Sequence, residues 1–152
     1  MKRRNKLVAT LLLFGISVNT MVGCGQNNKA DTEQDAYRKY GIICMENGDY
    51  EEALVDFTFL SKYNFKESKS MINQCQYRAG LNRYAAGEYE EARQLFSKVL
   101  AYKDSNAMYK ECTYRIAKLS YASSIEGALK EYSEISQYRD VPTILKQGVF
   151  TI

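Results

Sequence analysis

The residue types that most often carry out catalysis are sparse in this chain of 152 residues. It contains no histidine, which removes the commonest general base, the commonest zinc ligand and every Ser–His or Cys–His nucleophile pair. Two pairs of neighbouring carboxylates are present, Glu51-Glu52 and Glu90-Glu91. Each pair fits the first turn of an exposed helix, where carboxylates complement the helix dipole, so the pairs indicate no two-carboxylate hydrolase.

The three cysteines in the body of the chain do not suggest a reactive or metal-binding site. Cys44, Cys75 and Cys112 are single residues without C-x-x-C spacing. Equivalent positions on stacked helices lie about 8–10 Å apart, whereas a disulfide needs about 5.5 Å between Cα atoms. We therefore expect buried, free thiols that pack as small apolar groups. We expect no enzyme activity, no metal and no cofactor.

One further cysteine, Cys24, ends an apolar run that follows a basic N-terminus. The basic residues are Lys2, Arg3, Arg4 and Lys6, and the run extends from Leu7 to about Val22. This order is typical of a secretory signal. The final four residues, Met21-Val22-Gly23-Cys24, resemble the lipobox of bacterial lipoproteins.

The lipobox resemblance implies cleavage before Cys24 and lipidation of its thiol. Residues 1–23 would then be a signal peptide, and the protein would be held by lipid on the extracytoplasmic face of the cell membrane. The alternative is an uncleaved transmembrane anchor, for which about 16 apolar residues are short because a bilayer needs about 20.

Cleavage would change the charge of the chain, because residues 1–23 contain four basic residues and no acidic ones. Seventeen Lys and Arg would then face eighteen Asp and Glu. These charges alternate along the sequence and form no basic stripe, so we expect no binding to nucleic acid or to an anionic membrane surface. Membrane attachment would come from the acyl chains at Cys24.

Residues 24–34 are polar and lack apolar periodicity, which predicts a lipidated cysteine followed by a flexible tether. Ten such residues span on the order of 18 Å. Residues 35–152 remain for one domain, which is long enough to form a core.

An internal repeat dominates this domain. The segment Gly48-Asp49-Tyr50-Glu51-Glu52-Ala53 returns 39 residues later as Gly87-Glu88-Tyr89-Glu90-Glu91-Ala92, and a degenerate copy follows at Ser124-Ile125-Glu126-Gly127-Ala128. The segment Cys75-Gln76-Tyr77-Arg78 likewise matches Cys112-Thr113-Tyr114-Arg115. A fixed period of this length with helical composition predicts a solenoid of helical hairpins.

The apolar spacing within each unit predicts seven helices in antiparallel pairs, and hence an all-α protein. Long helices are expected over 35–47, 67–86 and 104–123, short helices after Asp49, Glu88 and Ser124, and a final helix over 140–148. Asp49 is placed to cap its helix, and Gly48 and Gly87 are placed for positive φ in the turns.

The repeat resembles the tetratricopeptide repeat. The residues that match its pattern are Tyr37, Gly41, Gly48, Tyr50, Ala53 and Phe57 in the first unit and Gly80, Gly87, Tyr89, Ala92 and Phe96 in the second. The resemblance covers about residues 35–137 and departs from the family in its period, which is 36 to 39 rather than 34, and in lacking a proline near the end of the unit. It implies a TPR-like solenoid that acts as a non-catalytic protein-interaction module.

In this family the first helix of each unit lines a groove. Tyr77 and Tyr84 lie seven residues apart on one such helix, and Tyr114 and Tyr121 repeat this placement on the next. The resemblance implies that all four tyrosines point into the groove. The predicted partner-binding set is therefore Tyr77, Tyr84, Tyr114 and Tyr121, flanked by Arg38, Arg78, Arg83, Arg115 and Lys118. Tyrosine and arginine suit such a surface. The alternative is that these tyrosines only pack helix against helix.

The sequence does not identify the partner. We expect an unidentified envelope protein or peptide; a role as an accessory of envelope assembly or secretion, and the capture of a peptide or glycan, are alternatives. The C-terminal residues 148–152 are apolar, so they are expected either to fold back over the last helices or to support weak self-association.

Overall fold

Every regular element in the described part of the chain is a helix. The computed structural model describes residues 28–149. Its helices are α2 (Asn28–Asn47), α3 (Tyr50–Ser61), α4 (Ser68–Ala85), α5 (Tyr89–Ser97), α6 (Ser105–Ser120), α7 (Ile125–Glu134) and α8 (Val141–Val149). The prediction of an all-α protein is confirmed. Residues 1–23, Cys24 and residues 150–152, on which the signal, lipidation and C-terminal predictions depend, lie outside the described residues.

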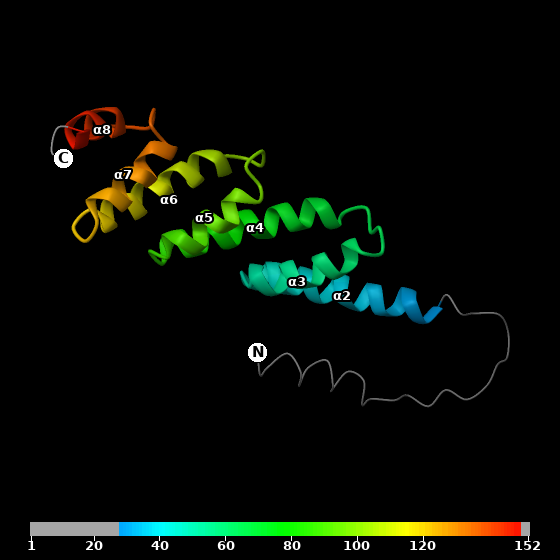
Figure 1. The fold of residues 1–152 in the computed structure, drawn as a ribbon. Helices are drawn as coiled ribbons and strands as arrows, with labels where there is room; N and C mark the ends of the chain where they lie inside the picture. Colours follow the sequence, from blue (N-terminus) through cyan, green and yellow to red (C-terminus); the bar gives the residue numbers. More distant parts are fainter. Residues whose placement is uncertain (1–27, 150–152) are drawn as a thin grey trace, which may run out of the picture.

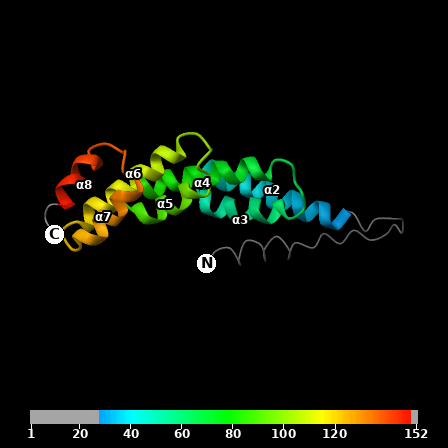
Figure 2. The same cartoon turned by 45° about the horizontal axis from the view of Figure 1, so that its top comes forward.

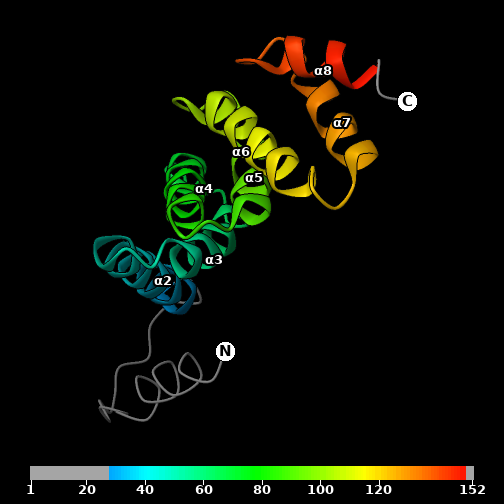
Figure 3. The same ribbon diagram turned by 90° about the vertical axis from the view of Figure 1, so that its left-hand side faces the viewer.

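The helices form a curved row in which each helix packs mainly against its neighbours in the chain. Figure 1 shows three antiparallel hairpins, α2/α3, α4/α5 and α6/α7, followed by α8. Figure 2 shows that the row is elongated, and Figure 3 shows that successive hairpins turn relative to one another. We call α2, α4 and α6 the first helices and α3, α5 and α7 the second helices of these hairpins.

The same glycine–phenylalanine contact closes the first two hairpins. A Cβ atom on Gly41 of α2 would lie 3.0 Å from Cζ of Phe57 on α3, and one on Gly80 of α4 would lie 2.8 Å from Cε1 of Phe96 on α5. Both phenylalanines are fully buried. The glycines are therefore required because the ring occupies the space that any side chain would take.

The turns within these hairpins use glycine for a different reason. Gly48 and Gly87 have φ angles of 84° and 80°, a region that side-chain-bearing residues rarely adopt. The expected cap at Asp49 is absent, because its side chain makes no capping hydrogen bond. In the third hairpin Ser124 does cap α7, with its Oγ accepting a hydrogen bond of 3.0 Å from the Gly127 N–H.

The boundaries of two long helices differ from those expected. The first helix begins at Asn28, so that residues 28–34, expected to belong to the tether, are helical. This segment contains Lys, Ala, Glu and Gln, which favour helix even without an apolar stripe. Helix α6 ends at Ser120, three residues early. Among the described residues, no helix combines the length and apolar character needed to cross a bilayer.

Candidate functional site

Most of the predicted groove tyrosines are occupied by contacts within the protein. Tyr77 on α4 and Tyr114 on α6 are each only 9% exposed, and Tyr84 is half-buried. Tyr121, which follows the end of α6, is 43% exposed. Tyr77 and Tyr84 bond to residues at and in α6, Tyr114 packs against Tyr132 of α7 and Tyr138 of the loop that follows it, and Tyr121 is at the surface.

Tyrosine–carboxylate hydrogen bonds join α4 to α6. The Tyr77 hydroxyl donates to Asp104 Oδ1 over 2.6 Å, and the Tyr84 hydroxyl donates to Glu111 Oε1 over 3.2 Å. The hydrogen bond to Asp104 raises the pKa of Tyr77, and burial beside Glu111 raises that of Tyr84. Both hydroxyls therefore remain protonated donors at neutral pH.

A cation lies over the ring of a buried tyrosine, Tyr77 or Tyr114, at equivalent positions of two repeat units. The Lys103 ammonium lies 5.1 Å from the centroid of the Tyr77 ring and 5.4 Å from that of Tyr102. The Arg139 guanidinium lies 5.2 Å from the centroids of both Tyr114 and Tyr138. Such contacts are favourable because the ring face is negative. The cations shield the buried tyrosines from solvent.

Glu111 on α6 is the centre of the largest polar cluster at this surface. Its side chain is 8% exposed and has four partners. Its Oε1 accepts hydrogen bonds from Tyr84 and, over 2.8 Å, from Arg115 Nε. Its Oε2 accepts a hydrogen bond from Tyr138 over 2.9 Å and forms an ion pair with Arg139 over 2.7 Å. Burial alone would raise the pKa of Glu111, but these partners outweigh it and lower the pKa. The cluster links α4, α6 and the α7–α8 loop in one polar network.

The predicted cationic residues do not form one surface. Arg38 lies on α2 with its guanidinium 5.5 Å from the Phe65 ring centroid. Arg83 at the end of α4 forms ion pairs with Glu51 and Glu88. Arg78 on α4 and Lys118 on α6 are exposed, while Arg115 is held by Glu111. Arg83 therefore belongs to the hairpin turns and not to the surface that carries the tyrosines.

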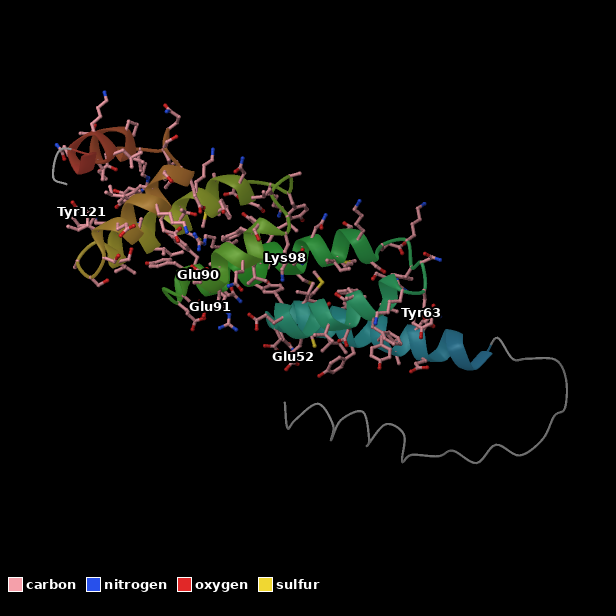
Figure 4. The ribbon with its side chains drawn as sticks, viewed as in Figure 1. Glu52, Tyr63, Glu90, Glu91, Lys98 and Tyr121 are labelled. Atoms are coloured by element: carbon pink, nitrogen blue, oxygen red, sulfur yellow. The ribbon has the colours of Figure 1, made fainter. Side chains whose placement is uncertain are left out.

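Exposed apolar side chains gather where α6 turns into α7. Leu119 is 69% exposed, and Tyr121 and Ile125 are each nearly half exposed. Lys118 lies beside them in the chain. We call these four residues the α6–α7 patch. Figure 4 shows Tyr121 at this end of the molecule, pointing away from the helices.

Two residues of the α6–α7 patch, Tyr121 and Lys118, belong to the predicted partner-binding set, whereas Leu119 and Ile125 do not. The repeat pattern gives no role to Leu119 and includes Ile125 only as part of the degenerate third copy. The partners of the buried tyrosines were also missed, although Asp104 and Glu111 each follow their tyrosine by 27 residues. That shared spacing was the available signal.

The cysteines pack as expected. Cys44, Cys75 and Cys112 are free and buried. Burial raises the pKa of the Cys75 thiol to about 11 and that of the Cys112 thiol to about 12. Since the thiolate is the reactive form, neither residue is a nucleophile at neutral pH.

One open pocket of about 440 Å³ lies beside the α2–α3 turn. It is lined by acidic residues, including Glu51, Glu52 and Glu88, together with Arg83. Arg83 forms ion pairs with Glu51 and Glu88 within this lining. Within residues that the structure describes, no group of three His, Cys, Asp or Glu side chains is placed to hold a metal ion.

The chain matches no protein-family model, no curated protein and no solved structure.

Proposed function

We propose that this protein is a lipid-anchored, non-catalytic interaction module of the cell envelope, built as a tetratricopeptide-like solenoid. Its anchor would be Cys24, and its partner an envelope protein or peptide. The observation that carries the proposal is the α6–α7 patch. Three of the seven large apolar side chains that are exposed in the described part of the chain lie within seven residues of one another at this turn. Exposed apolar side chains that gather at one place on a surface are typical of a protein-interaction site.

The neighbouring polar cluster supports this role because its hydrogen bonds and ion pairs link α6, which leads into the patch, to α4 and to the α7–α8 loop. The hydroxyls of Tyr77 and Tyr84 are committed to Asp104 and Glu111, so they offer no free hydrogen bond to a ligand in a groove. An α6 that is already held in place loses less conformational entropy when a partner binds, which reduces the free-energy cost of binding. In this proposal the buried tyrosines position the surface, and Tyr121 contacts the partner.

The chemistry of the patch defines the partner. Leu119, Tyr121 and Ile125 supply apolar contact, while Lys118 and the half-exposed Arg115 supply positive charge. A short helix or extended segment with apolar side chains and a flanking carboxylate would fit. Its apolar side chains would pack on the apolar residues of the patch, and its carboxylate would pair with Lys118 or Arg115.

The test is crosslinking in cells of the full-length protein, followed by mass spectrometry of the captured proteins. A variant with Leu119→Ser and Tyr121→Ser is expected to lose a discrete envelope partner that the unaltered protein captures. The matched control carries Ile43→Ser and Val55→Ser, which remove two apolar side chains of 51% and 46% exposure on α2 and α3. Because all four side chains are exposed, the free energy of unfolding of each variant should differ from that of the unaltered protein by no more than about 0.5 kcal/mol.

Retention of the same partner by the α6–α7 variant would refute the assignment of this surface. If neither the unaltered protein nor the control variant captures a partner, and a peptide or glycan raises the melting temperature of the unaltered protein, the proposal of an interaction module is replaced by that of ligand capture.

A further inference from the structure

Folding sorts the charges of the chain to two opposite edges. The loops that join a second helix to the next first helix, residues 62–67, 98–104 and 135–140, lie at one edge, which we call the loop edge. The turns that join a first helix to its second helix, residues 48–49, 86–88 and 121–124, lie at the other, the turn edge. In Figure 1 the loops are at the right-hand end of each hairpin and the turns at the left.

The two edges carry opposite charge. With the first turn of the helix that follows each connection included, the loop edge has six basic and three acidic residues, and the turn edge has seven acidic residues. The basic residues of the loop edge are Lys62, Lys66, Lys69, Lys98, Lys103 and Arg139. All of these charged residues are exposed. The basic residues nearest the turn edge, Arg83 and Lys118, lie in the last turns of the preceding helices α4 and α6. Figure 4 shows Glu52, Glu90 and Glu91 on the turn side.

The loop edge also exposes apolar side chains beside its lysines. Tyr63 is 51% exposed and Leu100 is 45% exposed. They occupy equivalent places in two successive loops, 37 residues apart, and each precedes a lysine by three residues, Lys66 or Lys103. Tyrosine and leucine among lysines are typical of a surface that enters the headgroup region of a bilayer.

The chain approaches this domain at the same edge. Helix α2 begins at Asn28, and Figure 1 places that end of α2 on the side of the loops. Asn28 follows Cys24 by four residues, which span at most about 14 Å. A lipid anchor at Cys24 therefore places the loop edge, and not the turn edge, next to the membrane.

The alternating charges of the sequence predict no binding to an anionic membrane, but their separation in the folded chain favours it. We propose that the loop edge is a membrane-contact surface that lies on anionic lipid headgroups, with Tyr63 and Leu100 in the interface. This inference rests on the lipid anchor of the proposed function. Lysines near an anionic surface are attracted to it, and the acidic turn edge is repelled. The bound orientation presents the α6–α7 patch, which lies at the turn edge, to partners away from the membrane.

The test is lysine footprinting of the full chain, produced in a bacterial membrane and reconstituted into vesicles. One set of vesicles is neutral phosphatidylcholine, and the other also contains anionic phosphatidylglycerol. A water-soluble amine-acylating reagent labels exposed lysines, and mass spectrometry measures Lys62, Lys66 and Lys98 relative to Lys130 on α7. We expect this ratio to be about threefold lower on the anionic vesicles, and the difference to shrink in high salt.

Charge-reversal variants test the cause of the protection. In a variant with Lys62→Glu and Lys98→Glu, the labelling of Lys66 should be equal on the two kinds of vesicle. The matched control, Lys130→Glu, should leave the protection of Lys66 unchanged, measured relative to Lys146. If all lysines of the acylated chain label equally on both vesicles, the orientation is refuted and the basic edge is free for an acidic soluble partner.

The same samples separate this outcome from failure of the anchor. The mass of the N-terminal peptide shows whether Cys24 carries acyl chains, independently of the footprint. A chain without acyl mass overturns the anchor and with it the premise of the membrane contact. An acylated chain without selective protection overturns only the membrane contact.

Discussion

Replacing Glu111 by glutamine tests whether the buried polar cluster holds the helices together. The carboxylate divides its four partners between two oxygens, with Tyr84 and Arg115 at Oε1 and Tyr138 and Arg139 at Oε2. A glutamine keeps one oxygen and places an NH₂ donor against the other two donors. In either orientation of the amide, one tyrosine bond and one arginine bond to the carboxylate are therefore lost.

The magnitude follows from the burial of these partners. A hydrogen bond from a buried hydroxyl to a charged acceptor contributes roughly 1.5–3 kcal/mol. The side chains of Arg115 and Arg139 are 43% and 48% exposed, so each can be solvated, and its ion pair contributes at most about 1 kcal/mol. We expect Glu111→Gln to lower the free energy of unfolding by about 2–3 kcal/mol, which corresponds to a decrease of about 1–2 M in the urea midpoint.

The loss should depend on pH, because the pKa of Glu111 in the folded protein is below its usual value of 4.5. A depressed pKa stabilises the fold fully above the unfolded-state pKa, and this stabilisation is lost as the pH falls through the folded-state pKa. Urea unfolding followed by circular dichroism should therefore show the full difference at about pH 7. At about pH 3 the difference between Glu111→Gln and the unaltered protein should be smaller.

The control for this measurement is Glu91→Gln, which removes an exposed carboxylate from the first turn of α5. It should change the free energy of unfolding by less than about 0.5 kcal/mol. An unchanged urea midpoint for Glu111→Gln at about pH 7, or a difference that does not narrow on acidification, would refute the view that the charged cluster stabilises the fold.

Three further predictions concern packing, backbone conformation and thiol chemistry. Gly80→Ala should lower the free energy of unfolding by about 1–3 kcal/mol, because its Cβ would clash with Phe96. In a double-mutant cycle measured in urea, Phe96→Leu should lower the free energy of unfolding less in the Gly80→Ala background than in the unaltered protein. Gly87→Ala should lower the free energy of unfolding by about 1 kcal/mol because of the φ of 80° alone, since no atom lies within 4 Å of the new Cβ. An equal decrease for Gly87→Ser, and none for Gly87→Asn, would support this cause. An increase in the free energy of unfolding for Gly87→Ala would contradict it. Cys75 and Cys112 should not react with a disulfide reagent at about pH 8 until urea unfolds the protein, because burial raises their thiol pKa to about 11 and about 12; rapid labelling of the folded protein would show that these thiols are accessible.

The candidate site was only partly predictable from the sequence. The heptad spacing of Tyr77 and Tyr84 correctly placed them on one face of one helix. Whether that face was open depended on the next hairpin, which contributes Asp104 just before α6 and Glu111 within it. Those partners lie 27 residues away, and local periodicity carries no information about contacts at that separation. Tyr121 follows the end of α6 at Ser120 and is 43% exposed, which the repeat pattern did not distinguish from the burial of Tyr84.

The sequence by itself determined the helical class, the repeating hairpins and the residues that close them. Glycine at positions 41 and 80, and phenylalanine at positions 57 and 96, form local contacts between consecutive helices, so their spacing in one dimension is sufficient to predict them. The tertiary structure alone decided which tyrosines are buried and how charge is distributed. Charges that alternate along the chain are sorted to opposite edges because each hairpin reverses direction, which returns every basic loop to one side and every acidic turn to the other.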